Sequence, residues 1–269
     1  MFKIIASDLD GTLLVDHQMD RIVDQTIKMV LANQRYFVLA TGRQMHPLHQ
    51  GAFRYDDPYF YIVANNGATI YDGKGNIVQK SLIDKEFIKL LVATFPNVHF
   101  EFICEDGTYI MSDRASFIAG YGKIWKDFYT MLEICKFDTP LAKLLAQDIM
   151  KINCNIEDPR LYATIDEFCL KHQELVVNAP FEPCQIEITA AGVDKGSAIK
   201  ALGKLLQVRD DQIVVYGDGG NDLKMLAAFE HAYVPENGCS AAKRLAKKIL
   251  AHNDTHSVAK HIQTMLAIE

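Results

Sequence analysis

Short apolar segments separated by helical patterns characterise the first third of the chain. Residues 4–6, 36–40 and 61–64 form apolar runs without polar alternation, each too short for a helix. Between the first two runs, apolar residues recur at helical spacing, and Asp20 stands where an N-cap residue is expected. Buried strands joined by helices predict a parallel sheet that is covered on both faces.

The pattern changes between about residues 83 and 190. Asp106-Gly107 lies between two strand candidates, residues 99–104 and 108–111, and is typical of a hairpin turn. Further helices are predicted at 85–95, 116–132 and 161–172, alternating with strands at 151–156 and 175–178. Such a mixture indicates an α+β module.

After residue 190 the first pattern returns, with a helix–strand–helix succession predicted over residues 195–228. We therefore expect an α/β fold with a Rossmann-like, doubly wound parallel-sheet core formed by residues 1–82 and 191–269. Residues 83–190 are expected to form an inserted α+β cap domain.

Composition and charge narrow the class of protein. The 269 residues are 49% hydrophobic and 23% charged, with a formal net charge of -6, which is ordinary for a soluble globular protein. The negative balance gives no general attraction to nucleic acid, although a local basic site can still bind a phosphorylated small molecule. The six cysteines are scattered without a C-x-x-C pair and match no zinc template.

Neither a secretory signal nor a membrane span is predicted. The N-terminal apolar run is broken at once by Asp8 and Asp10, and no uncharged apolar stretch approaches the length of a membrane helix. We therefore expect a cytoplasmic protein with no membrane partner. The sequence does not indicate an oligomeric state.

Polar clusters follow three of the predicted strands: Asp8-x-Asp10, Thr41-Gly42-Arg43, and the acidic and glycine-rich residues 217–222. Parallel strands place their carboxyl ends at one edge of the sheet, where open α/β sheets bind ligands. Four carboxylates gathered there need a compensating cation, and oxygen ligands with room for water favour Mg²⁺. Each cluster alone is explained equally well as a turn, a strand end or a helix cap, but their joint placement indicates function.

The four segments that carry this chemistry resemble the signature motifs of haloacid dehalogenase-like phosphatases: Asp8-Leu9-Asp10-Gly11-Thr12, Leu39-Ala40-Thr41-Gly42-Arg43, Asp194-Lys195-Gly196, and Gly217-Asp218-Gly219-Gly220-Asn221-Asp222. More narrowly, the chain resembles the Cof-type group, whose large C2-type (IIB) cap is inserted between the second and third motifs. The resemblance extends from Lys3 to the last helix.

This resemblance implies a role for each motif residue. Asp8 is expected to attack phosphorus and form an aspartyl-phosphate, while Asp10 protonates the leaving oxygen and then activates water. A halide leaving group needs no proton, so Asp10 argues against a dehalogenase. The cofactor Mg²⁺ is expected on the Asp8 carboxylate, the Asp10 backbone carbonyl and Asp218, with Asp222 supporting them.

The remaining motif residues are expected to bind phosphate. Thr41 would donate its hydroxyl and Gly42 its backbone N–H, and Lys195 and Asn221 would add a charge and a polar contact. A solvated helix lysine is the alternative for Lys195. The expected substrate is a small phosphomonoester such as a sugar phosphate.

Two other functions share the same motifs: a phosphosugar mutase with the same intermediate, and a non-catalytic phosphate-binding regulatory protein. Some roles also stay open in the sequence. Arg43 fits either a substrate contact or a carboxylate pair, Asn65-Asn66-Gly67 fits either the site or a turn, and His46 and His49 fit either a pocket or the surface. Residues 234–238 and 253–257 match the family pattern only in part.

Overall fold

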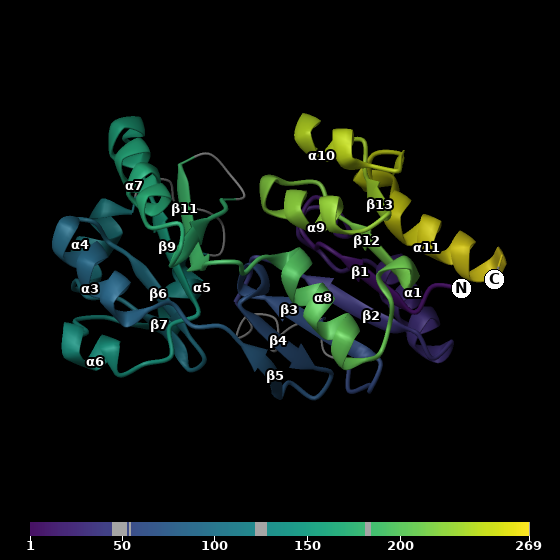
Figure 1. The fold of residues 1–269 in the computed structure, drawn as a ribbon, viewed down its shortest axis with the longest axis horizontal. Coiled ribbons are helices and arrows are strands. Elements are labelled where there is room, and N and C mark those ends of the chain that lie inside the picture. Colours follow the sequence, from purple (N-terminus) through teal and green to yellow (C-terminus); the bar gives the residue numbers. More distant parts are fainter. Residues whose placement is uncertain (45–52, 54, 122–127, 181–183, 269) are drawn as a thin grey trace. The chain divides into compact units, whose positions relative to one another are not determined.

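The chain folds into two compact units. The computed structural model describes residues 1–44, 53, 55–121, 128–180 and 184–268. One unit, called here the core unit, comprises Met1–Lys80 and Asp194–Glu269, and the other, the inserted unit, comprises Ser81–Val193 (Figure 1). The units join at 80/81 and 193/194, whereas the sequence predicted joints at 82/83 and 190/191.

The core unit is built on a sheet with the strand order β14-β13-β12-β1-β2-β3-β4-β5. Every pair from β14 to β3 is parallel, whereas β4 and β5 extend the edge in antiparallel fashion. The strands are β1 (Ile4–Ser7), β2 (Tyr36–Ala40), β3 (Phe60–Ala64), β4 (Thr69–Asp72), β5 (Ile77–Lys80), β12 (Ile213–Tyr216), β13 (His231–Val234) and β14 (Lys248–Ile249).

Helices cover both faces of this sheet because its strands are apolar on both sides. Ile5 packs in one buried cluster with α1 and α11, while Ile4 and Ala6 pack in another with α8 and α9. The helices are α1 (Arg21–Ala32), α8 (Lys195–Leu205), α9 (Leu223–Ala228), α10 (Ser240–Leu245) and α11 (Ser257–Ile268), with 3₁₀ turns η1 (Asn65–Gly67), η3 (Asp210–Gln212), η4 (Gly220–Asp222) and η5 (Asn253–Thr255). The predicted fold class is confirmed. Asp20 occupies the N-cap position of α1, although its side chain makes no capping hydrogen bond.

The inserted unit contains a second sheet, with the order β10-β11-β9-β6-β7-β8. One face of the sheet packs on α3, α6 and α7 to form a separate hydrophobic core. The elements are β6 (Glu101–Cys104), β7 (Gly107–Tyr109), β8 (Cys135–Lys136), β9 (Lys151–Asn155), β10 (Val176–Asn178), β11 (Gln185–Ala190), α3 (Lys85–Thr94), α4 (Arg114–Gly120), α5 (Phe128–Met131), η2 (Leu132–Ile134), α6 (Leu141–Leu145) and α7 (Pro159–Lys171).

The predicted hairpin corresponds to the antiparallel pair β6–β7. The helix expected over 116–132 is observed as α4 and α5, and the residues between 122 and 127 lie outside the described part of the chain. No strand was predicted from the sequence at β11, which pairs with both β9 and β10. Within the described ranges, none of the helices combines the length and hydrophobicity needed to cross a bilayer.

Candidate active site

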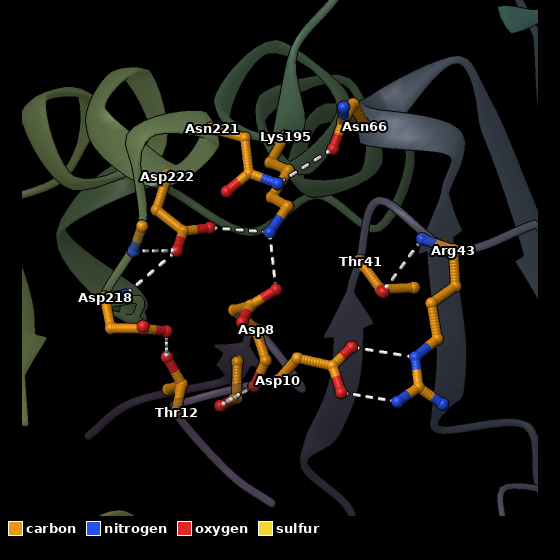
Figure 2. A network of polar contacts seen from close by, with 12 residues as sticks. Asp8, Asp10, Thr12, Thr41, Arg43, Asn66, Lys195, Asp218, Asn221 and Asp222 are labelled. Atoms are coloured by element: carbon orange, nitrogen blue, oxygen red, sulfur yellow. Dashed lines mark hydrogen bonds and ion pairs between the residues drawn. The ribbon is translucent and has the colours of Figure 1, made fainter. Parts of the chain in front are cut away.

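The carboxyl ends of β1, β2 and β12 meet at one edge of the core sheet, as parallel pairing requires. Ser7, the last residue of β1, pairs with Leu39 of β2 and with Tyr216 of β12. The backbone N–H of Asp8 still donates to the Tyr216 carbonyl, at 2.9 Å, so Asp8 starts its loop from a fixed position. Figure 2 shows the side chains that gather beyond these strand ends.

Lys195 joins the carboxylates of two remote segments. Its Nζ lies 2.5 Å from Asp8 Oδ1 and 2.6 Å from Asp222 Oδ1, and its side chain is completely buried (Figure 2). Lys195 is the first residue of α8, which Asp194 caps through a reciprocal pair of contacts with Ser197. A buried ammonium between two carboxylates excludes the solvated-lysine alternative for Lys195.

Asp222 organises the loop that follows β12. Its Oδ2 accepts backbone N–H groups from Asp218, at 2.9 Å, and Gly219, at 3.0 Å. Gly217 is required there, because a Cβ at this position would lie 2.6 Å from Asp222 Cβ. Since both oxygens of Asp222 already hold protein groups, Asp222 acts on the site by orienting Lys195 and Asp218.

Asp218 contacts the loop after β1 through Thr12, whose Oγ1 donates to Asp218 Oδ1 at 2.5 Å. Gly11 makes this approach possible: its φ is +79°, and an added Cβ would lie 2.5 Å from Asp218 Oδ2. Burial raises the pKa of Asp218 to about 6, with the Thr12 hydrogen bond opposing the shift and the Asp222 charge adding to it.

The Asp8 carboxylate is buried and only half satisfied. Oδ1 accepts from Lys195, while Oδ2 has no hydrogen-bond partner among the described residues. Burial raises the pKa of Asp8 well above its usual range against the opposing charge of Lys195, and Asp222 and Asp218 raise it further. One carboxylate oxygen each from Asp8, Asp218 and Asp222 lies within 4.8 Å of the others. An unpartnered oxygen in a group of hard oxygen donors fits a divalent cation such as Mg²⁺.

The Asp10 carboxylate lies outside this cluster and pairs with Arg43. Arg43 Nε donates to Asp10 Oδ2 at 2.7 Å, its Nη2 donates to Oδ1, and His17 Nδ1 lies 2.5 Å from Oδ1. Burial disfavours the charged form of Asp10, but the contacts with Arg43 and His17 outweigh it and lower the pKa. Of the two roles open for Arg43, the structure shows the carboxylate pair.

The second motif lies beside Asn66 and Asn221. The Thr41 hydroxyl, which is buried, accepts the Arg43 backbone N–H at 3.1 Å. Asn221 Nδ2 donates to Asn66 Oδ1 at 3.1 Å, and a Cβ on Gly42 would lie 2.9 Å from that same oxygen. Asn221 Oδ1 is buried and has no partner among the described residues.

The seven residues expected to form the site therefore lie at this edge of the sheet: Asp8, Asp10, Thr41, Lys195, Asp218 and Asn221, which Figure 2 labels, and Gly42, which lies beside Asn66 and Asn221. Two participants were given no role from the sequence, Thr12 of the first motif and His17, and Asn66 was left open between the site and a turn. Asn66 follows β3, the neighbour of β2, and this position after a strand was the sequence feature that indicated a place at the site. His46 and His49 lie outside the described residues.

Comparison with known proteins identifies the relatives of this site. The sequence profile of the haloacid dehalogenase-like hydrolases matches residues 5–262. A 5-amino-6-(5-phospho-D-ribitylamino)uracil phosphatase of Escherichia coli, YbjI, is 25% identical over 99% of this chain and 97% of its own. One of Bacillus subtilis, YcsE, is 24% identical over 97% of this chain and 94% of its own. The solved structure of the subclass IIB sugar phosphatase BT4131 shares the fold with a TM-score of 0.76, at 18% identity over 98% of each chain.

Proposed function

The chain belongs to the haloacid dehalogenase-like hydrolases, and we propose that, as a phosphatase of this family, it transfers the phosphoryl group of a small phosphomonoester first to Asp8 and then to water. The observation that carries the proposal is the Asp8 carboxylate. Lys195 fixes one of its oxygens, and the other is buried and finds no hydrogen-bond partner in the part of the chain that the structure describes. A carboxylate held in this way is oriented for attack on phosphorus.

In the first step, an Asp8 oxygen forms a bond to phosphorus as the bond to the leaving oxygen breaks. Asp10 supplies the proton that the leaving alkoxide needs. In the second step Asp10 takes a proton from water, the water oxygen bonds to phosphorus, and the phosphorus–Asp8 bond breaks to give inorganic phosphate. Because Arg43 holds Asp10 ionised, Asp10 must take up a proton and release one Arg43 contact before the first step.

The remaining groups compensate charge and orient the phosphoryl oxygens. Lys195 shares its charge with the nucleophile. The family resemblance implies that the Thr41 hydroxyl and the Gly42 N–H would donate to the phosphoryl oxygens and that Asn221 would add a polar contact. Asp8 and Asp218 would hold Mg²⁺, together with the Asp10 backbone carbonyl that the family resemblance implies. When bound, the ion supplies positive charge against the carboxylates and the phosphoryl group.

For the substrate, we propose a phosphomonoester with a hydroxylated leaving group. The support for this class of substrate comes from the relatives, because the phosphoribitylamino and sugar phosphates that name them carry several hydroxyl groups.

The test is phosphate release from a panel of phosphorylated sugars, sugar alcohols, nucleotides and cofactors, with Mg²⁺ or with EDTA. Wild type is compared with Asp8→Asn, which replaces the nucleophile by a group of the same size. We expect release that requires Mg²⁺ and is lost in Asp8→Asn. Product formed only by moving phosphate within a sugar, after addition of a sugar bisphosphate, would instead identify a mutase. Binding of substrate without any turnover would indicate a regulatory protein.

A further inference from the structure

A loop far from Asp10 in the sequence contacts the loop that carries Asp10. In the 235–239 loop, after β13, Asn237 Nδ2 donates to the Gly11 carbonyl at 2.6 Å. Its Oδ1 accepts the backbone N–H of Asn253 at 3.1 Å, and Asn253 Nδ2 donates to the Leu14 carbonyl at 3.0 Å. Two side-chain amides thus hold the Asp10 loop at Gly11 and at Leu14.

The same loop also contacts the Asp218 loop. The Cys239 N–H donates to the Asp218 carbonyl at 2.9 Å. Gly238 sits in a turn closed by its own N–H on Pro235, and a Cβ on Gly238 would lie 2.5 Å from Val234 Cγ1. The 235–239 loop therefore fixes the spacing of two segments that both contribute carboxylates to the site.

Gly11 explains why the Asp10 loop needs such support. Glycine is required at position 11 because Asp218 approaches so closely, but glycine also leaves the backbone unusually free. The Gly11 carbonyl belongs to the peptide that links Gly11 to Thr12, one residue beyond Asp10. A hydrogen bond from Asn237 to that carbonyl removes the freedom that glycine introduces.

We propose that Asn237 is a positioning residue for Asp10, and that Asn253 assists it by orienting the Asn237 amide. The inference rests on the proposed function, because it assigns these residues to the proton transfers of Asp10. Asn237 is neutral, and its side-chain amide is hydrogen-bonded to the backbone of Gly11 and of Asn253, so it acts by fixing where the Asp10 carboxyl meets the leaving oxygen. Loss of that alignment matters most when the leaving group needs its proton.

The decisive variant is Asn237→Asp, which keeps the shape and the acceptor for Asn253 N–H but replaces the donor facing Gly11 by an acceptor. Steady-state kinetics are measured with two substrates: an alkyl phosphate, whose alkoxide needs protonation, and p-nitrophenyl phosphate, whose phenolate departs without a proton. We expect kcat for the alkyl phosphate to fall roughly 10- to 100-fold with KM unchanged. For p-nitrophenyl phosphate we expect a fall of less than about threefold.

Asn253→Asp is the matched second variant, because it adds the same charge but removes the donor to Leu14, farther from Asp10. It should show the same selectivity with a smaller effect, and it decides the question if Asn237→Asp fails to fold in a thermal melt. An equal loss on both substrates, or no loss, would overturn the inference. Wild type that releases no phosphate from either substrate would refute the proposed function itself, whereas active wild type with unselective variants would refute the positioning role alone.

Discussion

Replacing the proposed nucleophile should make the protein more stable while abolishing its activity. Asp8 is 4% exposed, has one oxygen without a partner within the described ranges, and shares its surroundings with Asp218 and Asp222. Burial and these like charges raise its pKa despite Lys195, so the ionised form is disfavoured in the folded state. Asp8→Asn keeps the shape and removes the charge. We therefore expect a higher free energy of unfolding for this variant when no metal is bound.

The size of this stability gain follows from attractive and repulsive charge interactions of similar strength. At an effective dielectric constant of about 20, the Lys195–Asp8 contact at 2.5 Å is worth roughly 7 kcal/mol. Two carboxylates within 4.8 Å oppose it by at least roughly 3 kcal/mol each. The attraction and the repulsion nearly cancel, so the cost of removing the Asp8 charge from water, several kcal/mol, remains. The amide of Asp8→Asn is itself imperfectly paired, which costs about 1–3 kcal/mol. The variant should therefore gain roughly 1–3 kcal/mol in free energy of unfolding.

The assay is thermal unfolding of both proteins in EDTA and in Mg²⁺ at several pH values. One kcal/mol corresponds to roughly 2–4 °C at this chain length. The folded-state pKa of Asp8 is raised, so its destabilising effect appears as pH rises through that pKa. The advantage of Asp8→Asn should therefore vanish on acidification. Mg²⁺ should stabilise wild type more than the variant, which has lost a proposed ligand.

Asp10→Asn is the control, because it should change the free energy of unfolding in the opposite direction to Asp8→Asn. Its pKa is lowered in the folded state, so ionised Asp10 contributes stability that is lost only as pH falls through that pKa. At neutral pH this variant should be less stable than wild type. If Asp8→Asn melts below wild type in EDTA at pH 7.5, or if both asparagine variants shift the melting temperature in the same direction, then the Asp8 charge does not destabilise the folded protein.

Other substitutions test the remaining charges. Lys195→Met should lower the free energy of unfolding in urea by about 3–5 kcal/mol at neutral pH, because it leaves two buried carboxylates without their cation. The difference from wild type should shrink in acid, and a difference that is constant across pH would contradict this. Arg43→Ala should raise the pKa of Asp10 in a carboxyl-carbon NMR titration, and an unchanged pKa would show that Arg43 does not set it. Burial raises the pKa of Glu101, on β6, so wild type loses stability as pH rises through that pKa. The melting temperature of Glu101→Gln should therefore rise relative to that of wild type as pH increases, and a difference independent of pH would count against a buried charge there.

The convergence of the catalytic motifs was predictable because it depends on topology. Once residues 4–6, 36–40 and 212–216 are assigned to a parallel sheet, Asp8, Thr41 and Asp218 must meet at the same edge. The antiparallel strands β4 and β5 were not predicted because they are short, and three of the four residues of β5 are exposed. In contrast, β11 alternates polar and apolar residues, and the signal was available in the sequence.

Contacts between side chains could not be predicted in the same way. Asn66 fits an ordinary turn as well as a site, and only the approach of Asn221 distinguishes the two. Arg43 could be placed near the strand end, but its pairing with Asp10 depends on how two loops face each other. Asn237 and Gly11 are 226 positions apart and share no local pattern, so their hydrogen bond is visible only in the fold.

The division of the core unit around the insertion has a consequence for biosynthesis. Asp8 and Lys195 are 187 positions apart, so a ribosome adding about 5–20 residues per second needs roughly 10–40 s to supply the second after the first. During that interval β1 can pair with β2, but its other edge waits for β12. An apolar central strand with an open edge is a site for pairing with other chains. The N-terminal segment of the core unit, Met1–Lys80, should therefore depend on chaperones until β12 has emerged from the ribosome. The inserted unit is continuous in sequence and does not have to wait for a later segment.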